Sequence, residues 1–514
     1  MANERVLGIQ EIVKGAGIVF IGTFLSYFLS FIYNLIAANY LSVEEFGMLT
    51  TGIMVLSISL VLAKLGMPNG AKRFVSFYLA KNDYKRVKGI IYSSYFIVGI
   101  FSVLTGLVVF LFSGMIAEKI FHSAELAPVL RVFALAIPFS SIILLSAAVS
   151  LGFRKAIYKV VVEAGAEKGL RILFFVIVML LGGGAIYASG AYLAGVVFGA
   201  IVSVFLVFNL AKKHNVKRAV YEHKELIYFS LPLIFTGVTG TLMRRFDKLI
   251  VGYFLGPSFV GIYAIAFSFA HILTISLSSL GALYNPIATS YFAKGKLETM
   301  ARTYESVTRL SFIVSFPILL VFILFSEQVI NVLYGESYTV GAGAMVILSV
   351  TFMLSLFLGP TSQTMLVINK TKQIFYISAI AAAINLSFNF ILIPLLMPYN
   401  LGLEGAATAT LIALAVQHIL LLREIKKTVY VRAFHSYYIK YLISGAIAIG
   451  VFYFAGGILQ INLITMILLA IGLAGVYGVA LILLKSFTDE DKMLLKAIEK
   501  KIGIKTSIVD RVLK

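Results

Sequence analysis

Residues 243–263 read MRRFDKLIVGYFLGPSFVGIY, and four charged side chains stand near the start of this stretch: Arg244, Arg245, Asp247 and Lys248. Apolar sequence surrounds these charges on both sides. If residues 225–254 form one membrane helix, all four charges lie within the depth of the bilayer. A charged side chain there costs about 2.5 to 3.5 kcal/mol on insertion scales, and the cost is tolerated where the side chain faces a wet cavity. The stretch therefore predicts a functional site inside a membrane helix.

The composition is that of a membrane protein. Of the 514 residues, 60% are hydrophobic and 13% are charged, and the mean hydropathy is +0.98. Apolar runs of about 18 or more residues recur along the chain, as transmembrane helices require. The first run, near 13–38, is too long for the core of a signal peptide, so we expect it to be the first spanning helix. The absence of cysteine excludes disulfides, thiolate chemistry and Cys-ligated metals.

The apolar runs predict an all-α, polytopic membrane protein with about fourteen transmembrane helices. We place the spans at residues 13–38, 47–70, 89–112, 128–152, 160–182, 187–210, 225–254, 260–284, 309–325, 342–368, 373–396, 403–422, 440–458 and 463–484.

The net charge of +20 is an orientation signal and does not indicate nucleic acid. Most of the 43 Lys and Arg residues fall at the N-terminus and in the even-numbered connections, whereas the opposite loops carry mainly Glu. By the positive-inside rule, both termini are cytoplasmic and the protein is a multi-pass protein of the cell membrane. We expect the basic face to contact anionic lipids of the inner leaflet.

The two halves of the chain resemble each other at an offset of about 213 to 215 residues. YLSVEEFG at 40–47 aligns with FLGPSFVG at 254–261. Each half holds six spans and starts on the same side, so we expect parallel repeats with the substrate site at their interface. The alternative is that any two membrane segments look alike, and the nearly constant offset counts against it.

This repeat defines the predicted organisation: an N-terminal six-helix lobe (1–218), a C-terminal six-helix lobe (219–432), two additional transmembrane helices (433–485) and a cytoplasmic tail (486–514). The tail begins with an N-cap box at 488–491. We expect an amphipathic helix from there to about residue 501, lying on the inner membrane surface, with partner binding as the alternative.

Three motifs resemble those of one transporter family. DKLIVGYFLGPSFVGIY (247–263) is similar to the seventh-helix region of polysaccharide flippases of the Wzx type, and 40–47 is similar to their first outer loop. NLSFNFILIP (385–394) followed by GLEGAATAT (402–410) resembles their connection between helices 11 and 12. These proteins belong to the multidrug/oligosaccharidyl-lipid/polysaccharide exporter (MOP) superfamily. The resemblance implies two six-helix bundles around a central cavity, and translocation of a lipid-diphosphate-linked oligosaccharide from the inner to the outer leaflet.

The charges at 244–248 suit such a cargo. Cations are needed to bind its phosphates, so we expect Arg244, Arg245 and Lys248 to bind substrate. Asp247 lies three residues after Arg244 on the same helix face, where it can orient and partly neutralise that arginine. The alternative is a shorter helix, which would leave these charges at the outer headgroups.

Other charges fall inside predicted spans. Lys64 is a candidate for the cavity, or it snorkels to the inner headgroups. Glu163, Glu167 and Arg171 follow one another at four-residue intervals, so on an α-helix they would share a face and neutralise one another. They are either a strut between helices or part of the path, with Arg171 binding substrate. Glu163, Glu167 and Asp247 are the candidates for coupling to H⁺ or Na⁺.

Polar and aromatic residues offer further contacts. Tyr27 and Tyr33 are candidates for stacking on sugars, although most such residues only pack or mark interfaces. Asn385 and Asn389 lie at a comparable place in the second half, and hydrogen bonding between helices is the simpler explanation for them. No nucleotide-binding Gly loop and no metal-ligand cluster is found, so we expect no cofactor and no direct use of ATP.

The sequence therefore favours a flippase that works by alternating access, not an enzyme, and we expect it to be a monomer. A multidrug exporter of the same superfamily and a peptidoglycan-precursor flippase are the nearest alternatives. The first would prefer an acidic cavity. A membrane glycan polymerase or glycosyltransferase would need an external loop with catalytic carboxylates, and no predicted loop carries them.

Overall fold

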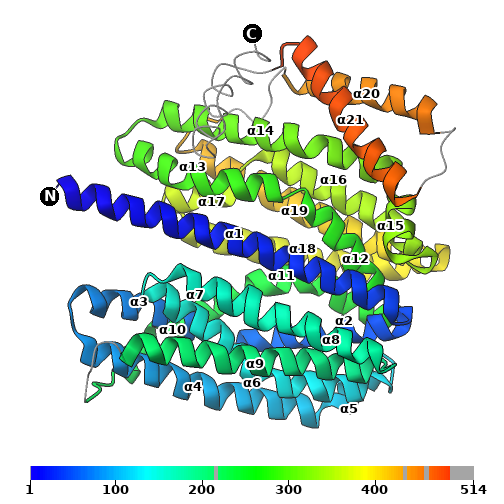
Figure 1. Ribbon diagram of the computed structural model, residues 1–514. Helices are drawn as coiled ribbons and strands as arrows, with labels where there is room; N and C mark the ends of the chain where they lie inside the picture. The colour runs from blue at the N-terminus through cyan, green and yellow to red at the C-terminus, as the bar shows by residue number, and fades with distance from the viewer. Residues whose placement is uncertain (1, 213–217, 432–436, 457–461, 487–514) are drawn as a thin grey trace. The chain divides into compact units, whose positions relative to one another are not determined.

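The computed structural model describes residues 2–212, 218–431, 437–456 and 462–486, and every regular element within these ranges is helical (Figure 1). Side chains are described except at 2–20, 235–244, 282–283, 453–456 and 463. The prediction of an all-α fold is confirmed. The amphipathic helix predicted in the tail lies outside the described residues.

The chain forms two compact units, 1–264 and 265–514. This division lies inside a helix, α12 (Pro257–Ile272), and differs from the boundary at 218/219 that the sequence repeat predicts. The difference arises because α10 (His223–Ser230) packs on α3 (Met67–Ala80), and α11 (Pro232–Leu255) packs on α2 (Val43–Ala63). The first helices of the predicted C-terminal lobe are therefore part of the first unit.

The other helices of the first unit are long and largely apolar. They are α1 (Ala2–Tyr40), α4 (Tyr84–Leu111), α5 (Ser113–Met115), the π-helical η1 (Ile116–Ile120), α6 (Leu126–Gly152), α7 (Ala156–Val160), the π-helical η2 (Val161–Gly169), α8 (Leu170–Leu180) and α9 (Ala185–Lys212). Within this unit α6 lies between α4 and α9, and the three run side by side in Figure 1.

Two predicted spans of the first unit are each divided into two helices. The span predicted at 47–70 breaks after Ala63, because Leu65 and Gly66 have positive φ angles of 47° and 68°. Pro68 then lies in the first turn of α3, where its missing N–H removes no helical hydrogen bond. The helix predicted at 225–254 is likewise divided by Pro232, which begins α11.

Glycines allow the closest helix contacts in the first unit. A Cβ on Gly47 of α2 would lie 2.4 Å from the backbone oxygen of Pro257, at the start of α12. A Cβ on Gly261 would lie 3.1 Å from the Cα of Gly47. These two glycines occupy matching places in the two copies of the repeated motif, and they touch each other.

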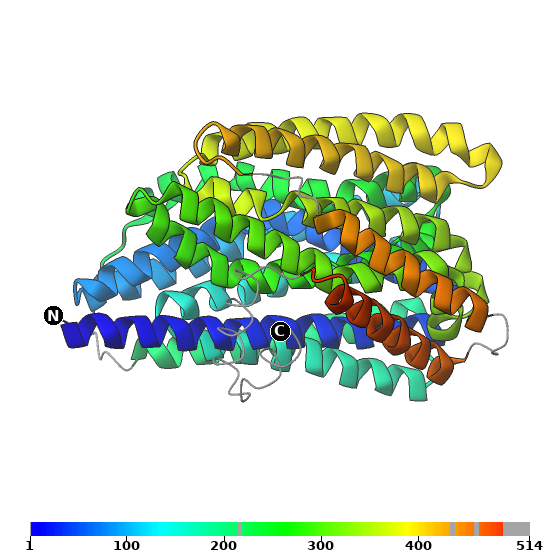
Figure 2. The same cartoon turned by 90° about the horizontal axis from the view of Figure 1, so that it is seen from above.

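The second unit continues with α13 (Ile275–Ala293), α14 (Leu297–Leu324), α15 (Ser326–Tyr334), the 3₁₀ helix η3 (Glu336–Gly341), α16 (Ala342–Leu358), α17 (Thr361–Val367), α18 (Thr371–Leu396), the 3₁₀ helix η4 (Met397–Tyr399), α19 (Gly402–Lys426), α20 (Tyr437–Gly456) and α21 (Leu463–Leu483). The two C-terminal helices are part of this unit. Both pack on α14, and α18 pairs with α19 along its length (Figure 2).

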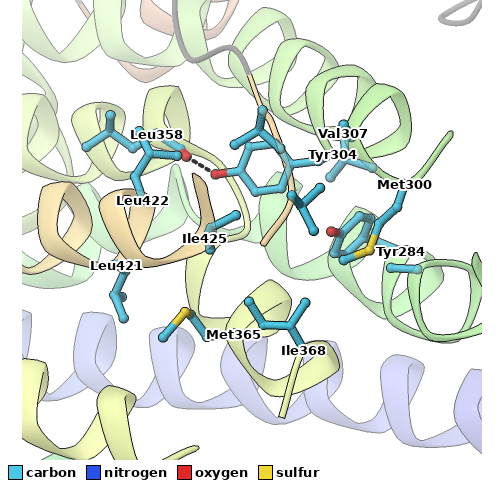
Figure 3. Close-up of a cluster of buried hydrophobic side chains, with 14 of the residues drawn as sticks. Tyr284, Met300, Tyr304, Val307, Leu358, Met365, Ile368, Leu421, Leu422 and Ile425 are labelled. Atoms are coloured by element: carbon cyan, nitrogen blue, oxygen red, sulfur yellow. Dashed lines mark hydrogen bonds between the residues drawn. The ribbon is translucent and has the colours of Figure 1, made fainter. Parts of the chain in front are cut away.

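A helix break is buried in the core of the second unit. α16 ends at Leu358 and α17 begins at Thr361, with Gly359 at φ 85° between them. The hydroxyl of Tyr304 donates to the carbonyl oxygen of Leu358, as Figure 3 shows. This bond satisfies an acceptor that the broken helix leaves without a helical partner. The hydroxyls of Tyr284 and Thr364 form a second bond nearby, 2.9 Å long.

The order of elements repeats along the chain. A short helix follows α4, and another, α15, follows α14; the kinked α2–α3 pair corresponds to α12–α13, which bends by 46°. In the described ranges, ten helical segments are long and apolar enough to cross a membrane, or eleven if the bent pair is one span. The predicted spans at 160–182, 225–254 and 440–458 are not among them. The first two of these contain the clustered charges, and the count of fourteen stays a prediction.

Candidate functional site

The charges of the opening stretch lie in the interior of α11. Asp247 is 1% exposed and Lys248 is 6% exposed, while Arg245 is partly buried. After Lys248 the helix continues to Leu255, roughly 10 Å further along its axis. The side chain of Arg244 lies outside the described residues. Lys248 has electrostatic interactions with both Arg245 and Asp247, so the three form one group.

A second buried cation, Arg171, lies in the first turn of α8 and is 6% exposed. Its guanidinium carbon is 4.4 Å from the ring centroid of Tyr33 on α1 and 4.9 Å from that of Tyr192 on α9. Both tyrosines are buried. Cations over aromatic faces are attracted by the ring quadrupole, and the attraction is stronger where water is excluded. Three helices therefore contribute to holding this one cation.

Tyr192 connects the two groups of charges. Its hydroxyl accepts a hydrogen bond from Arg171 and interacts electrostatically with Arg171, with Glu167 and with Arg245 of α11. Tyr192 of α9 thus interacts with charged residues of both α8 and α11. The buried charges of these two helices belong to one polar region inside the first unit.

The predicted ladder of Glu163, Glu167 and Arg171 is not formed. Residues 161–169 are π-helical, so their backbone bonds connect i with i+5 and the four-residue spacing no longer defines one face. Glu163 instead lies 3.8 Å from Lys159, in an ion pair. Among the described residues no carboxylate forms an ion pair with Arg171, and its Nε has no hydrogen-bond partner. The prediction that these three residues form a ladder on one helical face was wrong, whereas the roles predicted for each of them stay predictions.

Two glycines of α9 explain the close approach of this segment. A Cβ on Gly195 would lie 2.8 Å from the Cα of Arg171, and one on Gly199 would lie 3.2 Å from the Cα of Glu167. The glycines are four residues apart, the spacing of the small-residue motif that lets membrane helices pack closely. This packing brings the Arg171 backbone directly against α9.

The remaining predicted residues lie apart from this cluster or have a different environment. Lys64 is the C-cap residue of α2, where a cation favourably meets the helix dipole. Tyr27 is 59% exposed on α1. Tyr33 is 2% exposed and packs edge-on against Phe175, so its ring contacts Arg171 and Phe175 in this structure.

The second unit contains buried polar groups of its own. Asn385 and Asn389 are buried in α18, where Nδ2 of Asn389 donates to the backbone oxygen of Asn385 at 2.9 Å. Arg309 in α14 is 5% exposed and donates to the Ser306 hydroxyl at 3.0 Å. No group of three or more His, Asp or Glu able to hold a metal ion occurs in the described part of the chain.

Sequence reasoning missed Tyr192 and Arg309. Tyr192 lies one turn before Gly195, so the glycine pair of α9 was the available signal that this face meets another helix. Arg309 stood at the edge of a predicted span, where an arginine usually snorkels to the headgroups.

Cations outnumber acids among the buried charges of the first unit. Of its described charged side chains, the buried ones are Arg171, Asp247 and Lys248. Two of these are cations and one is an acid. An interior of this polarity suits an anionic ligand better than a cationic one.

Comparison with known proteins places the chain in a family. A family model described as polysaccharide biosynthesis protein matches residues 36–342, more than half of the chain. An uncharacterized membrane protein of Methanocaldococcus jannaschii is 24% identical over 78% of this chain and 81% of its own length. Stage V sporulation protein B of Bacillus subtilis is 21% identical over 78% of this chain and 80% of its own length. A probable low-salt glycan biosynthesis flippase of Haloferax volcanii is 22% identical over 44% of this chain and 46% of its own length.

Solved structures share the fold. The lipid II flippase MurJ, in an inward closed conformation, superposes with a TM-score of 0.66 at 16% identity, covering 89% of this chain and 97% of that one. An inward-facing multidrug resistance transporter of the MATE family gives 0.64 at 15% identity, covering 78% and 95%. That transporter belongs to the MOP superfamily. These likenesses show that the chain shares the fold of these transporters, and its apolar helices are those of a multi-pass membrane protein. By the match to the family model, the chain belongs to the polysaccharide biosynthesis protein family.

Proposed function

We propose that this flippase moves a lipid-diphosphate-linked oligosaccharide from the inner to the outer leaflet. The observation that carries the proposal is the pair of buried cations, Arg171 and Lys248, in the polar interior of the first unit. Burying a cation in an apolar interior costs free energy, so cations at such positions usually serve to bind a ligand or an ion. A diphosphate is an anion that must cross the same membrane, and buried positive charge attracts it.

The cations divide the work of binding. Arg171, Arg244 and Arg245 carry planar guanidinium groups, which bind phosphate oxygens through two parallel hydrogen bonds. Lys248 acts as a compact point charge beside them. Asp247, buried next to Lys248 and Arg245, orients this group and limits its repulsion. Tyr27, the exposed tyrosine of α1, is the remaining candidate for stacking on sugar.

Transport would proceed by alternating access, with one bundle moving against the other and either an ion gradient or the membrane potential providing direction. One elementary charge moved through 100 mV is worth about 2.3 kcal/mol, so a few charges on the cargo or on coupled ions would suffice. Asp247, Glu163 and Glu167 are the acids that we propose for coupling to H⁺ or Na⁺. The proposed setting is the cell membrane, with both termini cytoplasmic, anionic lipids against the basic face, and a monomeric transporter.

Two other cargoes are possible within the superfamily. A peptidoglycan-precursor lipid also carries a diphosphate, and MurJ, which shares the fold, is a lipid II flippase. An organic cation would be repelled by the buried cations, so a multidrug exporter is the weaker candidate. Lys64, at the end of α2, stays a proposed substrate contact at the entrance to the path.

A reconstituted flipping assay tests the proposal. The purified protein is placed in vesicles that contain a lipid-diphosphate-linked oligosaccharide with a fluorescent sugar, and dithionite is added outside. We expect protein-free vesicles to lose only the fluorescence of their outer leaflet, and vesicles with the flippase to lose nearly all of it. Equal losses of fluorescence from vesicles with and without the protein would overturn the proposal. Transport of a lipophilic cation dye in place of the glycolipid would also overturn it.

Matched variants identify the binding groups. We expect Arg244→Ala and Arg245→Ala to abolish flipping without lowering the amount of protein in the membrane. Arg302→Ala is the control, because Arg302 is an exposed arginine that pairs with Glu298 at 2.9 Å on the surface of α14. Full activity in both α11 variants would remove these arginines from the binding site. Lipid II offered in the same assay distinguishes the peptidoglycan alternative.

A further inference from the structure

Two buried polar groups in the first unit lack a hydrogen-bond partner and lie next to each other. They are the Nε of Arg171 and the hydroxyl of Tyr33, and no atom of the described residues bonds to either. The two residues are in contact, since the guanidinium carbon of Arg171 is 4.4 Å from the Tyr33 ring centroid. Both side chains are more than nine-tenths buried. Buried donors of this kind are rare in native proteins, and each one calls for a ligand, a water or a functional reason.

The way in which Arg171 is held explains why these donors stay available. A carboxylate partner would fix the guanidinium, but it would also neutralise its charge and occupy its donors. Two tyrosine rings hold the guanidinium through its π surface, and the Tyr192 hydroxyl accepts one hydrogen bond from it, which leaves the Nε without a partner among the described residues. The rings belong to Tyr33 on α1 and Tyr192 on α9. Glu167 lies within electrostatic range of Tyr192, yet it forms no ion pair with Arg171 among the described residues.

We propose that Tyr33 and Tyr192 are positioning residues that hold Arg171 as a charged, unneutralised donor for an oxyanion of the cargo. This inference rests on the proposed function and deepens it. The rings set the plane of the guanidinium, and the in-plane N–H groups of Arg171 together with the Tyr33 hydroxyl donate to the oxyanion. The oxyanion has two chemical sources in such a cargo: the diphosphate, or the carboxylate of an acidic sugar.

A comparison of short probes in detergent tests the inference and separates the two sources. The probes are farnesyl diphosphate, farnesol and glucuronate, and the readout is the concentration of each that raises the unfolding temperature of the protein. If the diphosphate is the ligand, farnesyl diphosphate stabilises the wild type and farnesol does not. If the acidic sugar is the ligand, glucuronate stabilises it instead. Stabilisation by neither anion would overturn the inference.

Variants of the three residues provide the decisive contrast. We expect Arg171→Met to weaken anion binding by at least about tenfold, because a charge-assisted hydrogen bond is lost. Tyr192→Leu and Tyr33→Leu remove a ring and are expected to weaken binding similarly, whereas Tyr192→Phe keeps the ring, loses only the hydrogen bond to Arg171, and should bind anions more tightly than Tyr192→Leu. Arg171→Lys keeps the charge but loses the planar fork, and we expect it to bind weakly. The unfolding temperature without probe shows which variants are folded.

The outcomes also separate this inference from the proposed function. If the wild type flips the glycolipid and Arg171→Met binds anions and flips equally well, the positioning role is overturned and the flippase proposal stands. If Tyr192→Phe is as defective as Tyr192→Leu, the hydroxyl and not the ring is what matters, and the positioning role again fails. If the wild type flips no glycolipid at all, the proposed function fails, whatever the probes show.

Discussion

The guanidinium carbon of Arg171 lies 4.4 Å from the centre of the Tyr33 ring, and these two residues come from the fifth and the first of the predicted spans. A buried cation in this membrane protein is thus stabilised by an aromatic face in place of an acid. The arrangement depends on α8 lying close against α9, because Tyr192 of α9 provides the second ring. It follows that the glycines of α9 are as important to this site as the charged residues.

Gly195→Leu tests that dependence. The new Cβ would lie 2.8 Å from the Cα of Arg171, so one of the two helix backbones must move. We expect a loss of about 1 to 3 kcal/mol in the free energy of unfolding, as for other overpacked cores. Denaturant titration in detergent measures it.

Gly190→Leu is the matched control in the same helix, because nothing lies within 4 Å of a Cβ at that position. We expect it to be neutral or slightly stabilising, since leucine favours helix more than glycine does. Equal behaviour of the two variants would show that the contact between α8 and α9 is looser than described.

Asp247→Asn tests the proposed role of this acid in coupling. The substitution is nearly isosteric, so we expect the protein to stay folded, and the flipping rate to lose its dependence on pH or on Na⁺. The measurement is the flipping assay repeated over a range of pH and of Na⁺ concentration. Glu298→Gln, an exposed acid on α14, is the control. A profile for Asp247→Asn that matches the wild type would leave Glu163 and Glu167 as the remaining candidates.

Tyr78→Phe tests the attachment of α10 to α3, outside the apolar spans. The Tyr78 hydroxyl donates to Oε2 of Glu225 at 3.1 Å. Burial, this hydrogen bond and the nearby acids raise the pKa of Tyr78 above its ordinary value of 10.0. A group whose pKa is raised by folding stabilises the protein fully below its unfolded pKa, and the contribution is lost as the pH rises through the raised value.

We therefore expect Tyr78→Phe to lower the free energy of unfolding by about 1 kcal/mol at neutral pH. The difference from the wild type should narrow above about pH 10, the ordinary tyrosine pKa. Unfolding curves at several pH values measure this. Tyr84→Phe is the control, because the Tyr84 hydroxyl donates to Asn82, only two residues away. If the difference in the free energy of unfolding between the wild type and Tyr78→Phe stays constant above pH 10, the stabilising role of the Tyr78 hydroxyl is contradicted.

Gly47→Leu tests the contact between α2 and α12. The substitution would place a Cβ 2.4 Å from a backbone oxygen, at Pro257, which no side-chain rotation can relieve. We expect a loss of about 1 to 3 kcal/mol in the free energy of unfolding. Gly99→Leu on α4, which meets nothing within 4 Å, should be tolerated. A fully stable Gly47→Leu variant would indicate that α2 and α12 separate readily.

Sequence reasoning predicted the features that depend on composition and local order. The apolar runs predicted an all-α membrane fold, and the motifs at 40–47, 247–263 and 385–410 pointed to a polysaccharide flippase family, in keeping with the family model that matches the chain. The division of span 47–70 was also within reach, because Gly66 and Pro68 are turn and first-turn residues.

The features that escaped prediction depend on contacts between helices. Residues 161–169 are π-helical, and Glu167 in this segment packs against Gly199, which is distant in sequence. The sequence pattern was read as an α-helix, so a four-residue spacing was misread as one helical face. The environment of Tyr33 could not be predicted for the same reason. The sequence pattern around an aromatic residue in a span is the same whether its ring contacts a sugar, a lipid or Arg171.

The contact between Gly47 and Gly261 has an evolutionary consequence. If the two halves arose by gene duplication, these positions descend from one glycine, and in a half-length ancestor that paired with itself the residue would have faced its own copy. Every mutation there would have changed both sides of the contact together. In the fused chain each side can vary alone, so homologues that have lost one of the two glycines should carry a compensating change only in the opposing helix.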